Sequence, residues 1–307
     1  MTIKRLHANT DAGEYIVDVA AAAVANGDVT PGEIFYVNSI RFTVLKSNIN
    51  HKVYLGFFSR FTVRPSALYV QDNLTAKMAG TPACGGSVLC NEYCQMRIAA
   101  AIAAGDITAI CPHCYADATA NRYDQLAGYL AYNDRLLNSE ILPADVLPVF
   151  KDAADNKDDD GLLRFSAFDD LHSATQFGNY CNIAALNPAR EAAAWTKNPW
   201  FIPAGLDAVG MTEKPANLRT IESCPSVNAH DWTPSGICER VFYVVTPKWA
   251  AANGITINCC DGVIKRVCGD CRRCYGLDDG GAPIYELLRA SQAVIDEIDR
   301  ITLGEAA

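Results

Sequence analysis

The first quarter of the chain carries one helical pattern followed by several strand patterns. Small apolar residues over residues 14–25, closed by the turn signal Asn26-Gly27, predict a helix. The next segments are rich in aromatic and β-branched residues and are separated by polar turns, as is typical of strands. Strands are predicted over residues 34–37, 41–45, 52–58 and 67–70. We therefore expect a helix and a β-rich segment within residues 1–75.

Further along the chain, helical and strand patterns alternate. Helices are predicted over residues 95–104, 116–138, 173–186, 203–209 and 283–301. Strands are predicted over residues 162–168, 192–196, 218–223 and 241–245. Alternation of this kind favours a mainly parallel sheet covered by helices. The predicted fold class is therefore α/β, with a (β/α) barrel-like core, complete or partial, that carries cysteine-rich metal-binding loops.

We expect residues 1–307 to form one elaborated domain, because the sequence shows no internal repeat and no long linker. Its predicted parts are the N-terminal helix with the β-rich segment (1–75), the barrel-like core bounded by two cysteine blocks (76–275) and a C-terminal helix (276–307). Residues 151–160, with their run of Asp, read as an exposed acidic loop.

Charge narrows the range of partners. The chain has 26 Lys and Arg against 35 Asp and Glu, a net charge of −9. An acidic surface repels phosphate backbones, so we expect no nucleic-acid partner. The Ala-rich run at residues 19–25 is short and flanked by Asp18 and Asp28, which indicates a soluble helix and not a membrane span. With no signal-peptide pattern at the N-terminus, the expected location is cytoplasmic.

The 13 cysteines are strongly clustered. Five lie between Cys84 and Cys114, and five between Cys259 and Cys274. In a reducing compartment, clustered cysteines are more often metal ligands or redox groups than disulfides. The three isolated cysteines are most simply small buried apolar residues. They are Cys181, Cys224 and Cys238.

The second block carries the strongest signal, Cys268-x2-Cys271-x2-Cys274. Bacterial ferredoxins use this spacing for three corners of a [4Fe–4S] cluster, with a distant cysteine as the fourth ligand. Here the fourth ligand would be Cys259 or Cys260. The Cys-Pro that completes the ferredoxin run is missing, so a ferredoxin domain is not predicted. A four-cysteine zinc site is the alternative.

The first block is Cys84-x5-Cys90-x3-Cys94, followed by Cys111-Pro-His-Cys114. Cys111 and Cys114 alone could be a redox dithiol, but the companion cysteines favour a metal. The opening C-x3-C resembles the radical-SAM signature, but Arg97 occupies the position of the third cysteine. Together the blocks exceed the four corners of one cluster. We expect two centres, or one centre with further cysteines around it, and the blocks could meet if barrel closure makes the first and last strands neighbours.

The cysteines are therefore assigned to two groups. The predicted cofactor ligands are Cys84, Cys111, Cys114, Cys260, Cys268, Cys271 and Cys274. Further predicted metal ligands are Cys90, Cys94 and Cys259.

Several short motifs resemble a family known mainly from phages and mobile elements, the gene product 88 family. They are Thr81-Pro82-x-Cys84, Cys114-Tyr115-Ala116, Trp195-Thr196-Lys197-Asn198, Lys214-Pro215-x-Asn217, Ser223-x-Pro225 and the C-terminal C-x2-C-x2-C run. The resemblance covers scattered fragments from Thr81 to Tyr275. It implies an iron–sulfur protein whose barrel-like fold is related to radical-SAM architecture, with no settled reaction. The sequence departs from the family pattern in an apparent insertion around Cys90 and in Asp169-Asp170, where a Gly-Asp pair is expected.

Polar residues follow three successive predicted strands. Asp169, Asp170 and His172 follow the first, Lys197 the second, and Ser223 ends the third. Barrel active sites are built at the carboxyl ends of strands, so we predict these residues as catalytic. The alternative is that Asp170 caps the following helix and its neighbours are solvated.

Two functions follow from these observations. The first is an enzyme whose [4Fe–4S] cluster acts as a Lewis acid in hydrolysis or hydration, or transfers electrons, toward a small-molecule substrate or a redox partner. Asp169, His172 or Lys197 would then carry protons. The second is a non-catalytic binding or regulatory protein that is braced by structural zinc or iron–sulfur sites.

Overall fold

The computed structural model describes most of the chain outside parts of the cysteine blocks. The described residues are 4–9, 16–38, 40–46, 53–56, 59–64, 66–71, 76–78, 92–114, 124–155, 159–229, 231–257, 268–276 and 279–305. The predictions made for Cys84, Cys90, Cys259 and Cys260 lie outside these residues, and for Cys94 only the backbone is described.

The N-terminal segment forms its own four-stranded sheet, of order β1-β2-β3-β4. Its elements are β1 (Lys4–Leu6), α1 (Ile16–Ala25), β2 (Ile34–Val37), β3 (Ile40–Lys46) and β4 (Val53–Gly56). Phe35 and Phe42 stack with their ring centroids 5.6 Å apart and are fully buried with Ala20 of α1. The predicted helix and its first strands are confirmed, while β1 was not predicted.

The central sheet has seven strands in the order β11-β10-β9-β8-β7-β6-β5. They are β5 (Val70–Gln71), β6 (Ala76–Met78), β7 (Leu162–Phe165), β8 (Glu191–Thr196), β9 (Leu218–Ser223), β10 (Arg240–Val245) and β11 (Ile284–Leu287). Neighbours from β6 to β11 pair in parallel, and β5 pairs antiparallel with β6. The five strands β7 to β11 curl into a half-barrel, which confirms the α/β class and a partial barrel.

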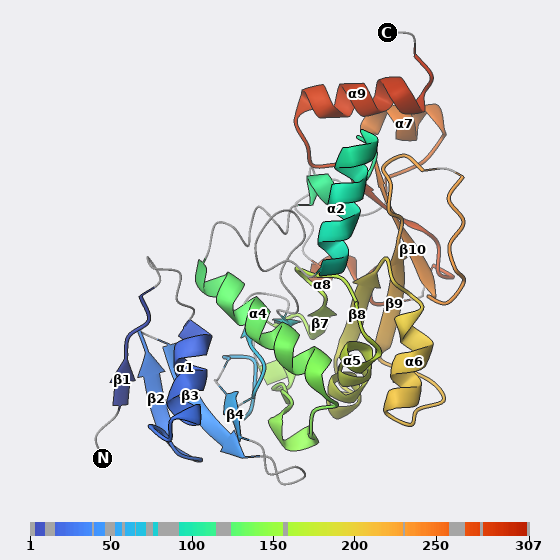
Figure 1. Ribbon diagram of the computed structural model, residues 1–307. Helices are drawn as coiled ribbons and strands as arrows, with labels where there is room; N and C mark the ends of the chain where they lie inside the picture. The colour runs from blue at the N-terminus through green and yellow to red at the C-terminus, as the bar shows by residue number, and fades with distance from the viewer. Residues whose placement is uncertain are drawn as a thin grey trace.

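Helices cover one face of this sheet, as Figure 1 shows for α4 (Asp124–Ser139), α5 (Ala174–Leu186) and α6 (Phe201–Ala208). Strand residues alternate between the two faces, as a pleated strand requires. Phe165 of β7 stacks on Tyr180 of α5 at 4.4 Å in the helix-covered core. Leu162, which begins β7 three residues before Phe165, belongs instead to the cluster on the inner face, together with Ile221 and Tyr275. Cys268, Cys271 and Cys274 of the second cysteine block pack against this inner-face cluster.

The predicted helix at 283–301 is wrong over its first residues. Ile284–Leu287 forms β11, parallel to β10, and the helix α9 covers Gln292–Thr302. The four residues Ile-Tyr-Glu-Leu fit either a strand or a helical turn, so the pattern alone could not separate the two structures. The free edge of β10 decided the outcome, because it offers backbone hydrogen bonds to this stretch.

The prediction of an exposed acidic loop at residues 151–160 is wrong for part of this segment. Asp159 is buried and ion-paired with Arg190, whose side chain is 3% exposed. Arg190 Nη1 donates to Asp159 Oδ1 at 3.0 Å, and Nη2 pairs with Oδ2. The pair fixes the end of this loop where β7 begins.

Candidate functional site

Polar side chains meet at the carboxyl edge of the sheet, where β7 and β8 end. Asp170 follows β7 and is 3% exposed. Its Oδ1 accepts hydrogen bonds from Thr196 Oγ1 at 2.7 Å, from Lys197 N at 3.0 Å and from Leu171 N at 2.8 Å. The carboxylate therefore ties the loop after β7 to the end of β8.

The alternative interpretation, in which Asp170 caps α5, is wrong. Ser173 is the N-cap residue, and its Oγ accepts from Gln176 N at 3.0 Å. Both residue types favour this position, but the Asp170 carboxylate is already engaged by β8.

Two cations face the second oxygen of Asp170. Lys197 Nζ lies 3.9 Å from Asp170 Oδ2, and Arg97 Nη1 lies 4.0 Å from the same oxygen. Arg97 belongs to α2 (Glu92–Ala104), and its Nη2 donates to Lys197 O at 3.2 Å and to Asn198 Oδ1 at 3.0 Å. The helix α2 is thereby attached to the carboxyl edge. In the sequence, Arg97 stands out only because it occupies the position of the third cysteine of the radical-SAM signature.

The described cysteines of the first block lie at the same edge. The short 3-10 helix η2 (Cys111–His113) follows a segment bound to the loop after β9, where Ile110 N donates to Pro225 O at 2.9 Å. A second bond, from Val227 N to Thr108 O at 2.7 Å, holds the segment from its other side. The loop after β9 thus helps to position Cys111.

Cys111 lies within electrostatic range of the charged groups that surround Asp170. Burial raises the pKa of the Cys111 thiol, while the nearby cations Lys197 and Arg97 lower it. Negative charge on Asp170 and on Cys114 raises the same pKa. A protonated, buried thiol therefore stands beside two cations and one carboxylate.

Two residues at the end of β9 complete this edge. Ser223 is 8% exposed and lies on the same sheet face as Ile221, two positions earlier. Cys224 is fully buried and its Sγ donates to Ser226 O at 3.3 Å. Burial raises the pKa of Cys224 to about 11, and the Lys197 cation lowers it. The Lys197 cation thus lowers the pKa of two thiols, Cys111 and Cys224.

The contacts of Asp169 and His172 run in another direction. Asp169 Oδ2 accepts from Gln176 Nε2 of α5 at 2.8 Å, and His172 Nε2 lies 3.3 Å from Asp134 Oδ1 of α4. Burial raises the pKa of Asp134, against the effect of His172. These two predicted proton carriers connect the β7 loop to helices, whereas Asp170 connects it to β8.

The second cysteine block lies at the opposite, amino end of the strands. Cys268 and Cys271 bound the short helix α8, and the thiols of Cys268, Cys271 and Cys274 pack against the inner-face cluster. Arg272 donates to Asp160 O at 2.8 Å, just before β7, and to Glu191 Oε2 at 3.0 Å, at the start of β8.

The surroundings of this block combine the apolar inner-face cluster with a few charged and polar side chains. The Tyr275 hydroxyl is buried and has no hydrogen-bond partner within the described part of the chain. Burial raises the pKa of Tyr275, as do charges on Cys268 and Cys274, while Arg164 lowers it. The Arg164 guanidinium stacks 4.4 Å from the Trp195 ring centre.

Lys77 of β6 completes the positive side of this environment. Burial, and then the Arg164 cation, lower the pKa of Lys77, while charges on Cys268 and Asp160 raise it. Two partly buried cations, Lys77 and Arg164, therefore lie close to Cys268.

That the two blocks could meet stays a prediction, because Cys84, Cys90, Cys259 and Cys260 lie outside the described residues. Strand β8 runs from Glu191, which Arg272 contacts, to Thr196, which binds Asp170. Five steps of roughly 3.3 Å separate these two residues by about 17 Å. Arg272 therefore lies near the amino end of β8, while Tyr275 packs edge-on against Trp195, with ring centroids 6.1 Å apart.

A complete metal site is not formed by the side chains that the structure describes. Among them, no three His, Cys, Asp or Glu are grouped closely enough to hold a metal ion. The donor chemistry of the second block nevertheless fits a thiolate-bound centre. It offers three cysteines, two nearby cations and one orphaned hydroxyl, and both candidate fourth ligands lie outside the described residues.

Comparisons of the chain with protein-family models, with curated proteins and with solved structures gave no match. The resemblance to the gene product 88 family therefore stays a prediction. None of the described helices combines the length and the apolar character needed to cross a membrane.

Proposed function

We propose that this chain is an iron–sulfur protein whose C-terminal cysteines hold a [4Fe–4S] cluster at the amino end of the half-barrel. Cys268, Cys271 and Cys274 would be three ligands, and Cys259 or Cys260 the fourth. The observation that carries the proposal is the Tyr275 hydroxyl, buried beside Cys268 and Cys274 without a partner among the described residues. A buried orphaned donor needs an explanation, and cluster sulfurs are acceptors.

The charges beside the block support the same proposal. Burying a cation is costly unless a negative group compensates it. Lys77 and Arg164 lie together close to Cys268, and the burial of Lys77 lowers its pKa. A cluster bound by four thiolates is anionic and would add negative charge beside both cations, on which the carboxylates of Asp160 and Glu286 already act. The apolar cluster that includes Tyr275 and Ile221 would shield the centre from water.

The place of the block favours electron transfer or bracing over Lewis-acid catalysis. When bound, such a cluster supplies a one-electron redox centre, or an open iron that polarises a substrate. About 17 Å of strand β8 separates the amino end from the Asp170 edge, at roughly 3.3 Å per residue. An iron held at Cys271 is therefore poorly placed to act on a substrate beside Asp170.

We further propose that the carboxyl edge binds a small anionic substrate. Arg97 and Lys197 supply two positive charges against the single carboxylate of Asp170. Anions bound in this way are typically carboxylates or phosphates, which arginine contacts in a bidentate manner. The thiol of Cys111 lies at the same place and becomes more reactive when its pKa falls. Asp170 would position Lys197, while Asp169 and His172 would act structurally.

Paired cysteine variants test the cluster assignment. Cys271→Ala removes a proposed ligand, whereas Cys238→Ala removes a half-buried cysteine outside both blocks. We expect an anaerobically purified wild-type chain and Cys238→Ala to show a broad absorption near roughly 400 nm that bleaches with dithionite. Cys271→Ala should lose it.

The ligand assignment would be wrong if the Cys271→Ala variant kept the full absorption. A chain that carries stoichiometric zinc in place of iron would overturn the iron assignment and support the alternative of a structural zinc site.

A further inference from the structure

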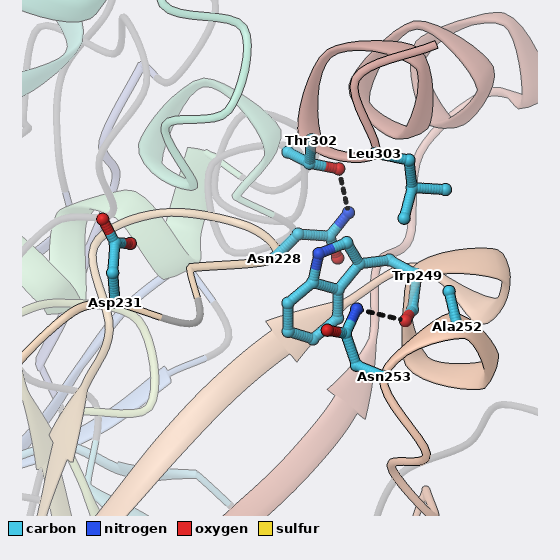
Figure 2. A pocket seen from close by; sticks show the side chains of 7 residues that line it. All are labelled: Asn228, Asp231, Trp249, Ala252, Asn253, Thr302 and Leu303. Atoms are coloured by element: carbon cyan, nitrogen blue, oxygen red, sulfur yellow. Dashed lines mark hydrogen bonds between the residues drawn. The ribbon is translucent and has the colours of Figure 1, made fainter.

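A hollow of about 490 Å³ opens at the carboxyl end of β10, beside the loop that follows β9. It lies between α7 (Pro247–Ala252) and α9, and Trp249 occupies its centre (Figure 2). In this view, Asp231 and Leu303 lie on opposite sides of the Trp249 ring. Hollows of this size accommodate small molecules, and the carboxyl ends of parallel strands are their usual place.

The wall beneath the hollow is fixed by a buried hydrogen-bond network. Asn228 Nδ2 donates to Thr246 Oγ1 at 3.1 Å and to Thr302 Oγ1 at 3.0 Å, and its Oδ1 accepts from Thr246 N at 2.8 Å. Thr302 Oγ1 in turn donates to Ile298 O at 2.9 Å. Because both amide hydrogens of Asn228 and the hydroxyl hydrogen of Thr302 are used, neither side chain can donate to a ligand.

The remaining polar groups of the hollow favour a positively charged ligand. Asp231 is exposed, and among the described residues that line the hollow it is the charged one; none of these described lining residues is Lys, Arg or His. Asn253 Nδ2 donates one hydrogen to Trp249 O at 2.9 Å, which leaves the amide oxygen as an acceptor and the second amide hydrogen as a donor. The charge of Asp231 therefore sets the preference of the hollow.

The apolar part of the hollow selects between kinds of cation. Trp249, Ala252 and Leu303 supply carbon surface that a hydrated metal ion would not use. An organic ammonium with an alkyl stem would satisfy both parts, with its charge toward Asp231 and its stem along Trp249 and Leu303. We propose that this hollow is a binding site for a small organic amine.

Three probes of equal length test the proposal on the intact chain. They are n-pentylammonium, n-pentanol and pentanoate, which each contain five carbons and carry a cationic, a neutral and an anionic head group. Each is titrated by calorimetry and by saturation-transfer NMR. We expect saturable binding of pentylammonium, at least ten-fold tighter than that of either other probe. Added salt should weaken it, because the carboxylate of Asp231 is exposed to screening.

Two matched carboxylate variants locate the binding. Asp231→Asn should weaken pentylammonium at least ten-fold, whereas Asp207→Asn, an exposed carboxylate on α6, should leave it unchanged. Asn253→Ala, also at an exposed position, should weaken it to a smaller extent. Equal affinities for all three probes, or unchanged binding in a folded Asp231→Asn variant, would overturn the proposal. Iron content does not enter this test.

Discussion

Replacing Asp170 by Asn separates the two tasks of this carboxylate. Its Oδ1 accepts three hydrogen bonds, from Leu171, Thr196 and Lys197, while its Oδ2 faces the cations Arg97 and Lys197. An Asn side chain keeps an oxygen at the first position and places an amide group at the second. The three hydrogen bonds to Oδ1 can therefore survive, but Lys197 N loses its longer bond to Oδ2, at 3.2 Å, and the two cations lose their counter-charge.

The expected cost follows from the distances and the exposure. Two unit charges near 4 Å attract by about 4 kcal/mol at an effective dielectric constant of roughly 20. The side chains of Arg97 and Lys197 are 25% and 20% exposed, so water screens part of this attraction. Breaking a buried pair typically costs about 3–5 kcal/mol. We expect Asp170→Asn to lower the free energy of unfolding by about 2–4 kcal/mol, toward the low side of that range because of the screening.

Asp170→Ala should be worse, because it also strands three donors. Each buried donor left without a partner costs about 1–3 kcal/mol, which brings the total above about 5 kcal/mol. That is comparable with the whole stability of many domains, so we expect this variant to fold poorly.

Urea unfolding, followed by circular dichroism, measures the difference between wild type and Asp170→Asn. Asp207→Asn on the exposed face of α6 is the matched control and should stay within about 0.5 kcal/mol of wild type. If Asp170→Asn also stayed within that range, the cations would not depend on this carboxylate, and the described carboxyl edge would be wrong.

Three further predictions concern the thiol, the buried ion pair and the orphaned hydroxyl. Lys197→Met removes a cation that lowers the pKa of Cys111, so we expect the pKa of this thiol to rise. Alkylation of Cys111 at one fixed pH, measured by peptide mass spectrometry, should therefore slow. An unchanged alkylation rate would argue against the proximity of Lys197 and Cys111. Arg190→Met leaves Asp159 buried without its partner and should cost about 3–5 kcal/mol in urea unfolding, most of it recovered when Asp159→Leu is added. Tyr275→Phe should keep the iron but shift the cluster potential to more negative values in a spectroelectrochemical titration, because hydrogen bonds to the sulfurs raise that potential; an unshifted potential would exclude this bond.

Much of the fold could be predicted from the sequence, because its apolar periods are visible within single segments. The helix α5 and the strands β8, β9 and β10 all lie where the pattern placed them, within two residues at their ends. β11 was missed because a four-residue stretch has too few positions to show a period. Its strand conformation comes from pairing with β10, which is a tertiary effect.

The candidate site could be predicted only where it follows a local rule. The rule that strands present functional groups at their carboxyl ends placed Asp170 and Lys197 together. Arg97 could not be found in this way, because it reaches Asn198 from a helix 101 residues earlier in the chain. The Tyr275 hydroxyl is equally invisible in sequence, since only packing shows that it is buried without a partner among the described residues.

The iron and acid-labile sulfide content of the full chain after anaerobic purification tests the proposed [4Fe–4S] cluster most directly. We expect about four irons and four sulfides per chain or more, as is typical of thiolate-held [4Fe–4S] clusters. A folded chain without iron and sulfide, or one that carries zinc instead, would contradict it.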